Sequence, residues 1–389
     1  MPTVIASAVR TPIGRFGGAF KDMSAVDLGS AAIAAALDRS GVDPARLDEV
    51  LFGHVLQAGA GQITSRQAAV GAGVPMTVPA TTINKVCLSG MSAIAIADRA
   101  IRLGEASLAV AGGMESMSTA PYVLPTARWG ARMGDTTLVD VMTHDGLWCA
   151  FDKCTMGESS DLRNATLGIG REEQDEWSAA SHARAAAADT TAEVVPVQVP
   201  QRRGDPVTVT NDEGIRQEAN LTSLSALRPA FAPDGSITAG NASQISDGAA
   251  ALVLADADAA AAADLPILAR VIAYGQVAGP DATLHERPAE AIQVALKRAG
   301  MAVSDLDLVE INEAFAAVAL WSTRLLGLDH DRVNVHGGAV ALGHPLGATG
   351  ARIVVTLINA LRLRGGGVGV AALCGGGGQG DALVVEVAG

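Results

Sequence analysis

A helix–turn–strand pattern occurs twice in this chain, with 259 residues between equivalent positions. Leu37–Val50 and Leu296–Val309 are identical at six of fourteen positions, where chance gives about one. Each copy starts as a helical run, reaches a glycine and continues into an apolar, strand-like run. Short β-like runs also alternate with Ala-rich helical runs along the chain, which is typical of α/β proteins. We therefore predict an α/β fold built from two similar α/β halves.

The predicted halves are separated by a stretch of different composition. Residues 116–245 hold seven of the 16 prolines and a charged segment, Arg171–Ala188, that is predicted to be helical. The apolar run Ser246–Leu254 then resembles a buried strand of the first half. We predict three parts: residues 1–115 with 246–264, an inserted loop domain over 116–245, and a second half over 265–389. An insertion of this size usually carries functional or assembly contacts.

Composition and charge exclude several classes of protein. With 49% apolar and 18% charged residues, the chain is not expected to be disordered. A net charge of −13 argues against nucleic-acid partners and against anionic membrane surfaces. The N-terminal segment lacks the pattern of a signal peptide, no uninterrupted apolar run is long enough for a membrane span, and four cysteines are too few for a disulfide scaffold. These features predict a cytoplasmic protein.

The segment around Cys87 has the features of a nucleophile. Asn84–Gly90 leads into a predicted helix, Ser89–Leu103, that ends at Gly104. A thiol at a helix N-terminus faces free N–H groups, which lower its pKa and favour the thiolate. The alternative is a buried structural cysteine, and this segment alone leaves both interpretations open.

A second candidate, His344, lies directly before Pro345 and a predicted helix. By the repeat offset, the start of this helix corresponds to the segment at Cys87. Two equivalent helix ends of a pseudo-twofold fold can meet at its centre, where His344 would accept the thiol proton. The alternative is a histidine in a surface loop. His336, in the same segment, is interpreted as structural.

Two further segments place chemically useful groups at strand ends. Cys374 precedes the run Gly375–Gly380, whose N–H groups can approach a ligand; the alternative is a buried small residue. The glycine spacing matches a dinucleotide fingerprint, but a strand is predicted after it, which excludes that reading. Asn312 and Glu313 follow a predicted strand and would either cap the next helix or position a water molecule.

The remaining polar signals are weaker. Basic residues gather in the insertion and are a candidate site for an anionic ligand; they are Arg202, Arg203, Arg216 and Arg228. His182 lies in the charged segment and is expected to be solvated. Cys149 and Cys154 have no second Cys/His pair at zinc-ligand spacing, and no metal site is predicted.

Taken together, these segments resemble the thiolase family from one end of the chain to the other. The matching stretches are Val9–Phe16, Asn84–Gly90, Gly112–Ser116, Thr238–Ser243, Asn312–Phe315, Gly337–Arg352 and Cys374–Gly376. The resemblance implies the thiolase fold, in which two similar α/β halves form stacked helices and sheets with an inserted loop domain. This agrees with the internal repeat.

The resemblance also implies roles for five residues. Cys87 matches the nucleophile that becomes the acyl-enzyme, and His344 matches its base, whose ring N–H also helps to hold an enolate oxygen. Asn312 matches the residue that fixes a water in the same oxyanion hole. Cys374 matches the acid/base for the α-carbon proton. Gly376 matches the residue whose N–H, with that of Cys87, holds the oxyanion of the acyl-transfer step.

Coenzyme A is implied as a substrate, with no permanently bound cofactor and no metal. The pantetheine arm would be lined by Leu147, Met156, Ala239, Ser243 and Phe315, and Arg216 would lie near the nucleotide end. Family members are typically dimers or dimers of dimers, which implies a homo-oligomer. The stretch Met117–Asp145 corresponds to the region that ties the tetramer together in many of them.

The activity implied is that of an acyltransferase, an acetyl-CoA acetyltransferase that reversibly condenses two acetyl-CoA molecules into acetoacetyl-CoA and CoA. One alternative is a degradative 3-ketoacyl-CoA thiolase for longer chains. Another is a non-catalytic, CoA-binding subunit, which usually lacks one or more of the four reactive side chains present here. Thr155 stands where many acetoacetyl-specific relatives have histidine, so chain-length preference stays open. Gly375 stands where a β-branched residue is common, and His285–Ala289 replaces a Gly-Pro-rich stretch.

Overall fold

The strands of both halves join in one mixed sheet, in a computed structural model that describes residues 2–389. Its order is β14–β15–β16–β13–β1–β12–β5–β3–β4, with the short β2 paired to β12. The strands are β1 (Thr3–Arg10), β2 (Gly14–Arg15), β3 (Glu49–Gly53), β4 (Ala80–Ile83), β5 (Leu108–Ser116), β12 (Ser246–Asp256), β13 (Ala269–Ala278), β14 (Leu308–Ile311), β15 (Gly367–Gly375) and β16 (Gln379–Val387). The predicted α/β class is confirmed.

The repeated sequence forms the same unit twice. Helix α1 (Ala25–Ser40) ends at Gly41, with φ 70°, before a 3₁₀ turn and β3. Helix α8 (Arg287–Ala299) ends at Gly300, with φ 69°, before a 3₁₀ turn and β14. Both glycines adopt the left-handed backbone conformation that closes a helix at little steric cost. The predicted helix–turn–strand duplication is therefore confirmed.

An aspartate shared by the two copies fixes the next strand in the same way. A side-chain oxygen of Asp48 accepts hydrogen bonds from the N–H groups of Ser107 and Leu108, at 2.7 and 3.0 Å. The equivalent Asp307 accepts one from the N–H of Val368 at 2.8 Å. In each half this bond ties the repeated unit to a strand, β5 or β15, that pairs with it in parallel.

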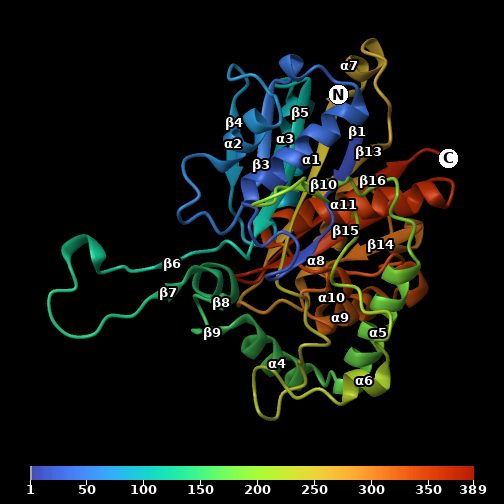
Figure 1. Cartoon of the computed structure of the whole chain (residues 1–389). Helices are drawn as coiled ribbons and strands as arrows, with labels where there is room; N and C mark the ends of the chain where they lie inside the picture. Colours follow the sequence, from blue (N-terminus) through green and yellow to red (C-terminus); the bar gives the residue numbers. More distant parts are fainter. Residues whose placement is uncertain (1) are drawn as a thin grey trace.

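Buried apolar residues show that helices and strands are stacked in layers (Figure 1). The central cluster unites α3 (Ser89–Leu103) and α11 (Leu346–Leu363) with inward-facing residues of strands from both halves. A second cluster packs α1 against the first half. A third packs α8 and α9 (Ala316–Leu326) against the second half. The two central helices are therefore covered on both sides by strands.

Helix α11 is long and apolar enough to cross a membrane by length and composition, but 89% of its apolar window is buried inside the protein. It is a core helix, and its start packs backbone to backbone against neighbouring elements. A Cβ added to Gly350 would lie 2.4 Å from the nitrogen of Met91 in α3. One added to Gly113 would lie 1.9 Å from the carbonyl oxygen of Gly347. The first contact brings the starts of α3 and α11 together, and the second packs the start of α11 on β5.

The insertion consists of short elements joined by loops. They are β6 (Tyr122–Val123), β7 (Val139–Asp140), a π-helical turn (Met142–Leu147), β8 (Trp148–Cys149), β9 (Cys154–Thr155), α4 (Met156–Leu167), α5 (Arg171–Ala187), β10 (Val197–Val199), β11 (Val207–Val209) and α6 (Leu221–Ser225). The β6–β7 hairpin extends away from the body (Figure 1). The other helices are α2 (Thr64–Gly71), α7 (Ala257–Ala262) and α10 (Ala339–Leu342).

The expectation that His182 is solvated is wrong. Its residue is 1% exposed, and its Nδ1 accepts a hydrogen bond from the N–H of Arg216 at 3.1 Å. Burial lowers the pKa of His182 to about 4. The charged sequence of α5 conceals a buried face, which also carries Trp177 and Ser181.

Candidate active site

A small cavity of about 60 Å³ brings together residues from distant parts of the chain. Its lining includes Cys87, His344, Cys374 and Gly376. Strand and helix ends supply them: Cys87 precedes α3, His344 precedes α11, and Cys374 lies at the end of β15. Four of the five residues with predicted catalytic roles therefore meet in one place.

The environment of Cys87 differs from the sequence expectation. The N–H groups of Gly376 and of Cys87 itself lower the pKa of the thiol, as expected at a helix start. Burial has the larger effect and raises that pKa to about 12. The predicted low pKa is wrong because desolvation outweighs these N–H groups. Cys87 is thus a thiol near neutral pH and needs a base to act as a nucleophile.

The hydrogen bonds of His344 make it suitable as that base. Thr349 Oγ1 donates to the carbonyl of Pro345 at 3.0 Å, so at its 2.7 Å contact with His344 Nδ1 it acts as the acceptor. This assigns the proton to Nδ1 and leaves the lone pair on Nε2, which has no protein partner among the described residues. Burial chiefly, with the charge of Arg352, lowers the pKa of His344 to about 3. The imidazole is therefore neutral near neutral pH and can accept a proton.

Cys374 is a second thiol beside the first. It is 1% exposed and pairs with Gly380 across the β15–β16 ladder. Burial, with Cys87 as a further cause, raises the pKa of Cys374 well above its usual range. Strand β16 follows the glycine run, as predicted, so the dinucleotide fingerprint is rightly excluded.

Asn312 and Glu313 do not cap the following helix. The residue before α9 is Phe315, and α9 has no side-chain cap bond, so the capping interpretation is wrong. Asn312 is fully buried, and neither Nδ2 nor Oδ1 has a protein hydrogen-bond partner among the described residues. Such a side chain is suited to binding a water molecule or a substrate oxygen.

Of the residues predicted to contact the pantetheine arm, four line the cavity: Leu147, Met156, Ser243 and Phe315. The fifth, Ala239, is exposed and does not line it, and Arg216, which was predicted near the nucleotide end, is exposed as well. The cavity is also lined by residues that were not predicted from the sequence, namely Gly146, Leu284, Ala314 and Leu346. Ala314 and Leu346 stand inside motifs that were singled out, whereas Leu284 has no recognisable local signal.

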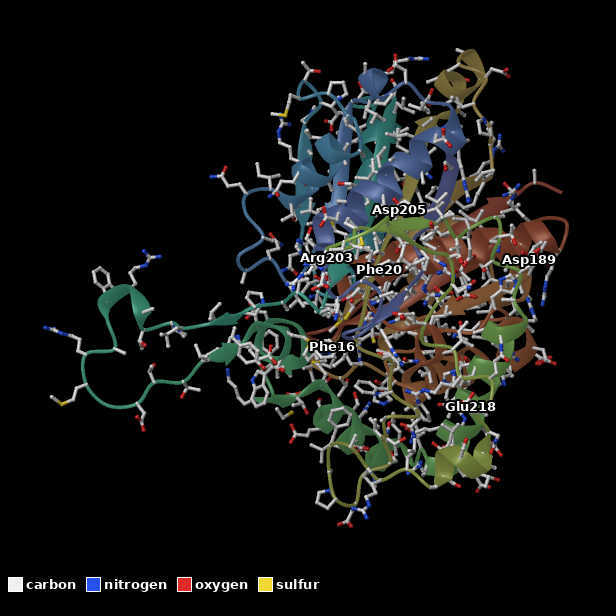
Figure 2. The ribbon with its side chains drawn as sticks, in the orientation of Figure 1. Phe16, Phe20, Asp189, Arg203, Asp205 and Glu218 are labelled. Carbon is white, nitrogen blue, oxygen red and sulfur yellow. The ribbon has the colours of Figure 1, made fainter. Side chains whose placement is uncertain are left out.

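The basic residues of the insertion are spread out. Arg203 follows β10, beside the first half, whereas Glu218, two residues after Arg216, lies at the other end of the insertion (Figure 2). Over residues 2–389, no group of three or more His, Cys, Asp or Glu side chains could hold a metal ion.

Family models match both halves of the chain. The model described as "Thiolase, N-terminal domain" matches residues 3–258, and "Thiolase, C-terminal domain" matches residues 265–387. The chain belongs to the thiolase family. The family resemblance inferred from the motifs is thereby confirmed.

Full-length relatives agree with this membership. A "Probable acetyl-CoA acetyltransferase" of Mycolicibacterium smegmatis is 53% identical, with 98% of this chain and 100% of the relative covered. An "Acetyl-CoA acetyltransferase" of Pseudomonas aeruginosa is 48% identical, with 98% of both chains covered. The crystal structure of the Bacillus anthracis acetyl-CoA acetyltransferase superimposes with a TM-score of 0.95 at 41% identity, covering 99% of this thiolase and 98% of that chain. The predicted thiolase fold is confirmed.

Proposed function

We propose that this thiolase is an acetyl-CoA acetyltransferase that interconverts two acetyl-CoA with acetoacetyl-CoA and CoA. The observation that carries the proposal is the cavity that holds two thiols, a neutral imidazole and the Gly376 backbone together. The names of the full-length relatives support the same substrate.

In the first step, Cys87 Sγ attacks the carbonyl carbon of acetyl-CoA and its proton passes to His344 Nε2. The oxyanion that forms is stabilised by the N–H groups of Cys87 and Gly376. The C–S bond to CoA then breaks, and the leaving sulfur takes the proton of Cys374, so that CoA leaves as a thiol and Cys374 becomes a thiolate. His344 keeps the proton of Cys87 on Nε2. The product is an acetyl thioester on Cys87.

In the second step, Cys374 removes a proton from the α-carbon of a second acetyl-CoA. A thioester α-proton is weakly acidic, so the enolate oxygen needs preorganised donors. We assign this task to the Nε2–H of His344, which holds the proton from Cys87, and to a water molecule held by Asn312. The α-carbon of the enolate attacks the acetyl carbon, the bond to Cys87 breaks as its sulfur takes the proton back from His344 Nε2, and acetoacetyl-CoA leaves. Cys374 keeps the α-proton and is a thiol again.

The experiment that tests this function is CoA-dependent thiolysis of acetoacetyl-CoA beside 3-keto-octanoyl-CoA, followed by loss of the 3-ketoacyl enolate absorbance. Preferential turnover of the four-carbon substrate is the expected result. Equal or better turnover of the longer chain would assign the protein to the degradative thiolases. Turnover of neither would support a non-catalytic role.

We also propose a homo-oligomer, a dimer or a dimer of dimers, in which the β6–β7 hairpin joins protomers. The hairpin tip exposes Trp129 and Met133 at 84% and 96%, far from the body of the protomer (Figure 1). Apolar side chains at the end of a projecting arm are typical of contact surfaces. Light scattering of the wild type and of the double variant Trp129→Ser, Met133→Ser tests this; an unchanged mass would contradict it.

A further inference from the structure

Among residues 2–389, no side chain forms a hydrogen bond with the side chain of Asn312. Its two polar atoms lack protein partners among the described residues, so its direction depends on the backbone that carries it. That backbone donates one bond, from the N–H of Asn312 to the carbonyl of Ala372 at 2.9 Å. The residues on either side of Asn312 must supply the remaining constraint.

Asn334 forms hydrogen bonds with both of these neighbours. Its Oδ1 accepts from the N–H of Ile311 at 2.8 Å, and its Nδ2 donates to the carbonyl of Ile311 at 2.8 Å. The same Nδ2 donates to Glu313 Oε1 at 2.9 Å. One buried amide therefore brackets Asn312 on both sides. Asn334 does so in a left-handed conformation, with φ 49°, which asparagine adopts more readily than most residues other than glycine.

Glu313 is the centre of this arrangement. It is fully buried, and each of its oxygens accepts two hydrogen bonds. Oε1 accepts from Asn334 and from Trp177 Nε1, the latter at 2.9 Å. Oε2 accepts from Ser181 Oγ at 2.7 Å and from the N–H of Val340 at 3.0 Å.

These contacts connect Asn312 with the segment that leads to His344. Val340 lies in α10, which ends just before Gly343 and His344. Ser181 Oγ also accepts from the N–H of Gly338 at 3.0 Å, and a Cβ on Gly338 would lie 2.3 Å from the Glu313 carboxyl carbon. Glu313 thus fits closely against the start of α10, and its other contacts anchor it to α5 of the insertion.

We propose that Glu313 and Asn334 form a positioning clamp that fixes Asn312 relative to His344 for the enolate step. Neither residue lines the cavity, and the polar atoms of both side chains are bonded to protein groups, so their role is to position Asn312. The inference rests on the proposed function, because that function assigns the enolate oxygen to Asn312 and His344. It predicts that the clamp serves the carbon–carbon step more than acyl transfer to Cys87.

The substitution Glu313→Gln tests the clamp with little change of shape. A glutamine replaces one carboxylate oxygen by an NH2 group, which accepts no hydrogen bond. With this group on the Oε1 side both bonds are lost; with it on the Oε2 side the bond from Val340 is lost, while Ser181 Oγ can turn to accept. The matched control is Trp177→Phe, which removes one donor and leaves Oε1 bonded to Asn334.

Two assays separate the steps. Exchange of labelled CoA into acetyl-CoA passes only through the acetyl-enzyme, whereas thiolysis of acetoacetyl-CoA also needs the enolate. For Glu313→Gln we expect thiolysis to fall about 100-fold and exchange less than about 10-fold, since a shift of about 1 Å in a positioned group has effects of this size. The control is expected to retain the wild-type ratio of the two rates.

Equal losses in both assays, or no loss, would overturn the clamp. If circular dichroism shows that Glu313→Gln is unfolded, the variant Asn334→Gly is used instead. Glycine adopts the left-handed φ without strain, and the substitution removes the hydrogen bonds to Ile311 and Glu313. The same selective loss is expected, and its absence contradicts the proposal. A wild-type enzyme that turns over no acetoacetyl-CoA would instead overturn the proposed function and the clamp with it, whereas an active wild type with an unchanged ratio in the variant overturns the clamp alone.

Discussion

The two halves carry contrasting residues at equivalent positions of the repeat. Gly53 ends β3 and Asn312 follows β14, and the repeat offset aligns them. A Cβ at Gly53 would lie 2.6 Å from the carbonyl oxygen of Gly347 and 2.7 Å from the nitrogen of Gly90, so no side chain fits. Asn312 carries a buried amide without protein partners among the described residues. The duplicated frame therefore uses one copy for close packing and the other for chemistry.

The largest expected effect comes from making the first half resemble the second at this position. Gly53→Ala places a methyl group against two backbone atoms that cannot move away cheaply, and we expect a loss of about 3 kcal/mol or more in the free energy of unfolding. Urea unfolding measures it. The control is Gly170→Ala, where the added Cβ meets nothing within 4 Å and about 1 kcal/mol or less is expected. Equal stability of the two variants would contradict the close approach.

The corresponding change in the second half removes the amide of Asn312 and leaves the backbone in place. Asn312→Ala leaves a small space in the second half, so the fold is expected to persist, while thiolysis of acetoacetyl-CoA falls about 100-fold through loss of one oxyanion contact. CoA exchange through the acetyl-enzyme is expected to change little. A variant that keeps wild-type thiolysis would show that Asn312 does not serve the enolate.

The comparison also explains what could be predicted from the sequence. The repeat and its two glycine-ended helices were predictable because helix closure and strand alternation are local properties. Cys87, His344 and Cys374 could be selected since each stands at a predicted element boundary. Their meeting in one cavity followed only from the pseudo-twofold argument and the family resemblance.

Properties that depend on burial could not be predicted. The pKa of Cys87 rises because the thiol is enclosed by residues far away in sequence, which no local rule reports. His182 looks solvated in a charged segment, yet its helix turns that face inward. Glu313 was a candidate cap, but its four donors come from residues 177, 181, 334 and 340. Long-range contacts decide all three cases.

The residues that directly follow the two catalytic cysteines also differ between the halves. Leu88, after Cys87, is fully buried, and Gly375, after Cys374, lacks a side chain. A Cβ at Gly375 would lie 2.5 Å from Leu88 Cγ, so the two positions share one space. We expect Gly375→Ala to destabilise the protein by about 2 kcal/mol and to slow thiolysis roughly 10-fold.

Adding Leu88→Ala to that variant opens the shared space. We expect the double variant to recover part of the lost thiolysis, although Leu88→Ala alone is destabilising because it leaves a cavity. A double-mutant cycle on stability and rate measures the coupling. Strictly additive effects would show that the two positions are independent. Contact with Leu88 would then not be the reason why position 375 is a glycine.

The last expected effect concerns acid stability. It distinguishes the buried His344 of the second half from an exposed histidine in the insertion. The folded-state pKa of His344, about 3, lies below its ordinary value of 6.5. The unfolded chain therefore takes up a proton as the pH falls below about 6.5, while the folded chain does not. The contribution of His344 to the free energy of unfolding is therefore fully present above that pH. It is lost progressively toward pH 3, by about 1.4 kcal/mol per pH unit. Between pH 6.5 and 5, the free energy of unfolding of the wild type should therefore fall at about this rate relative to that of His344→Gln. Urea unfolding at several pH values measures both. His144→Gln, at a side chain that is 66% exposed, is the control and should parallel the wild type. If the wild type and His344→Gln gave parallel curves, the imidazole would not be held neutral by burial, and its assignment as the base for Cys87 would lose its electrostatic support.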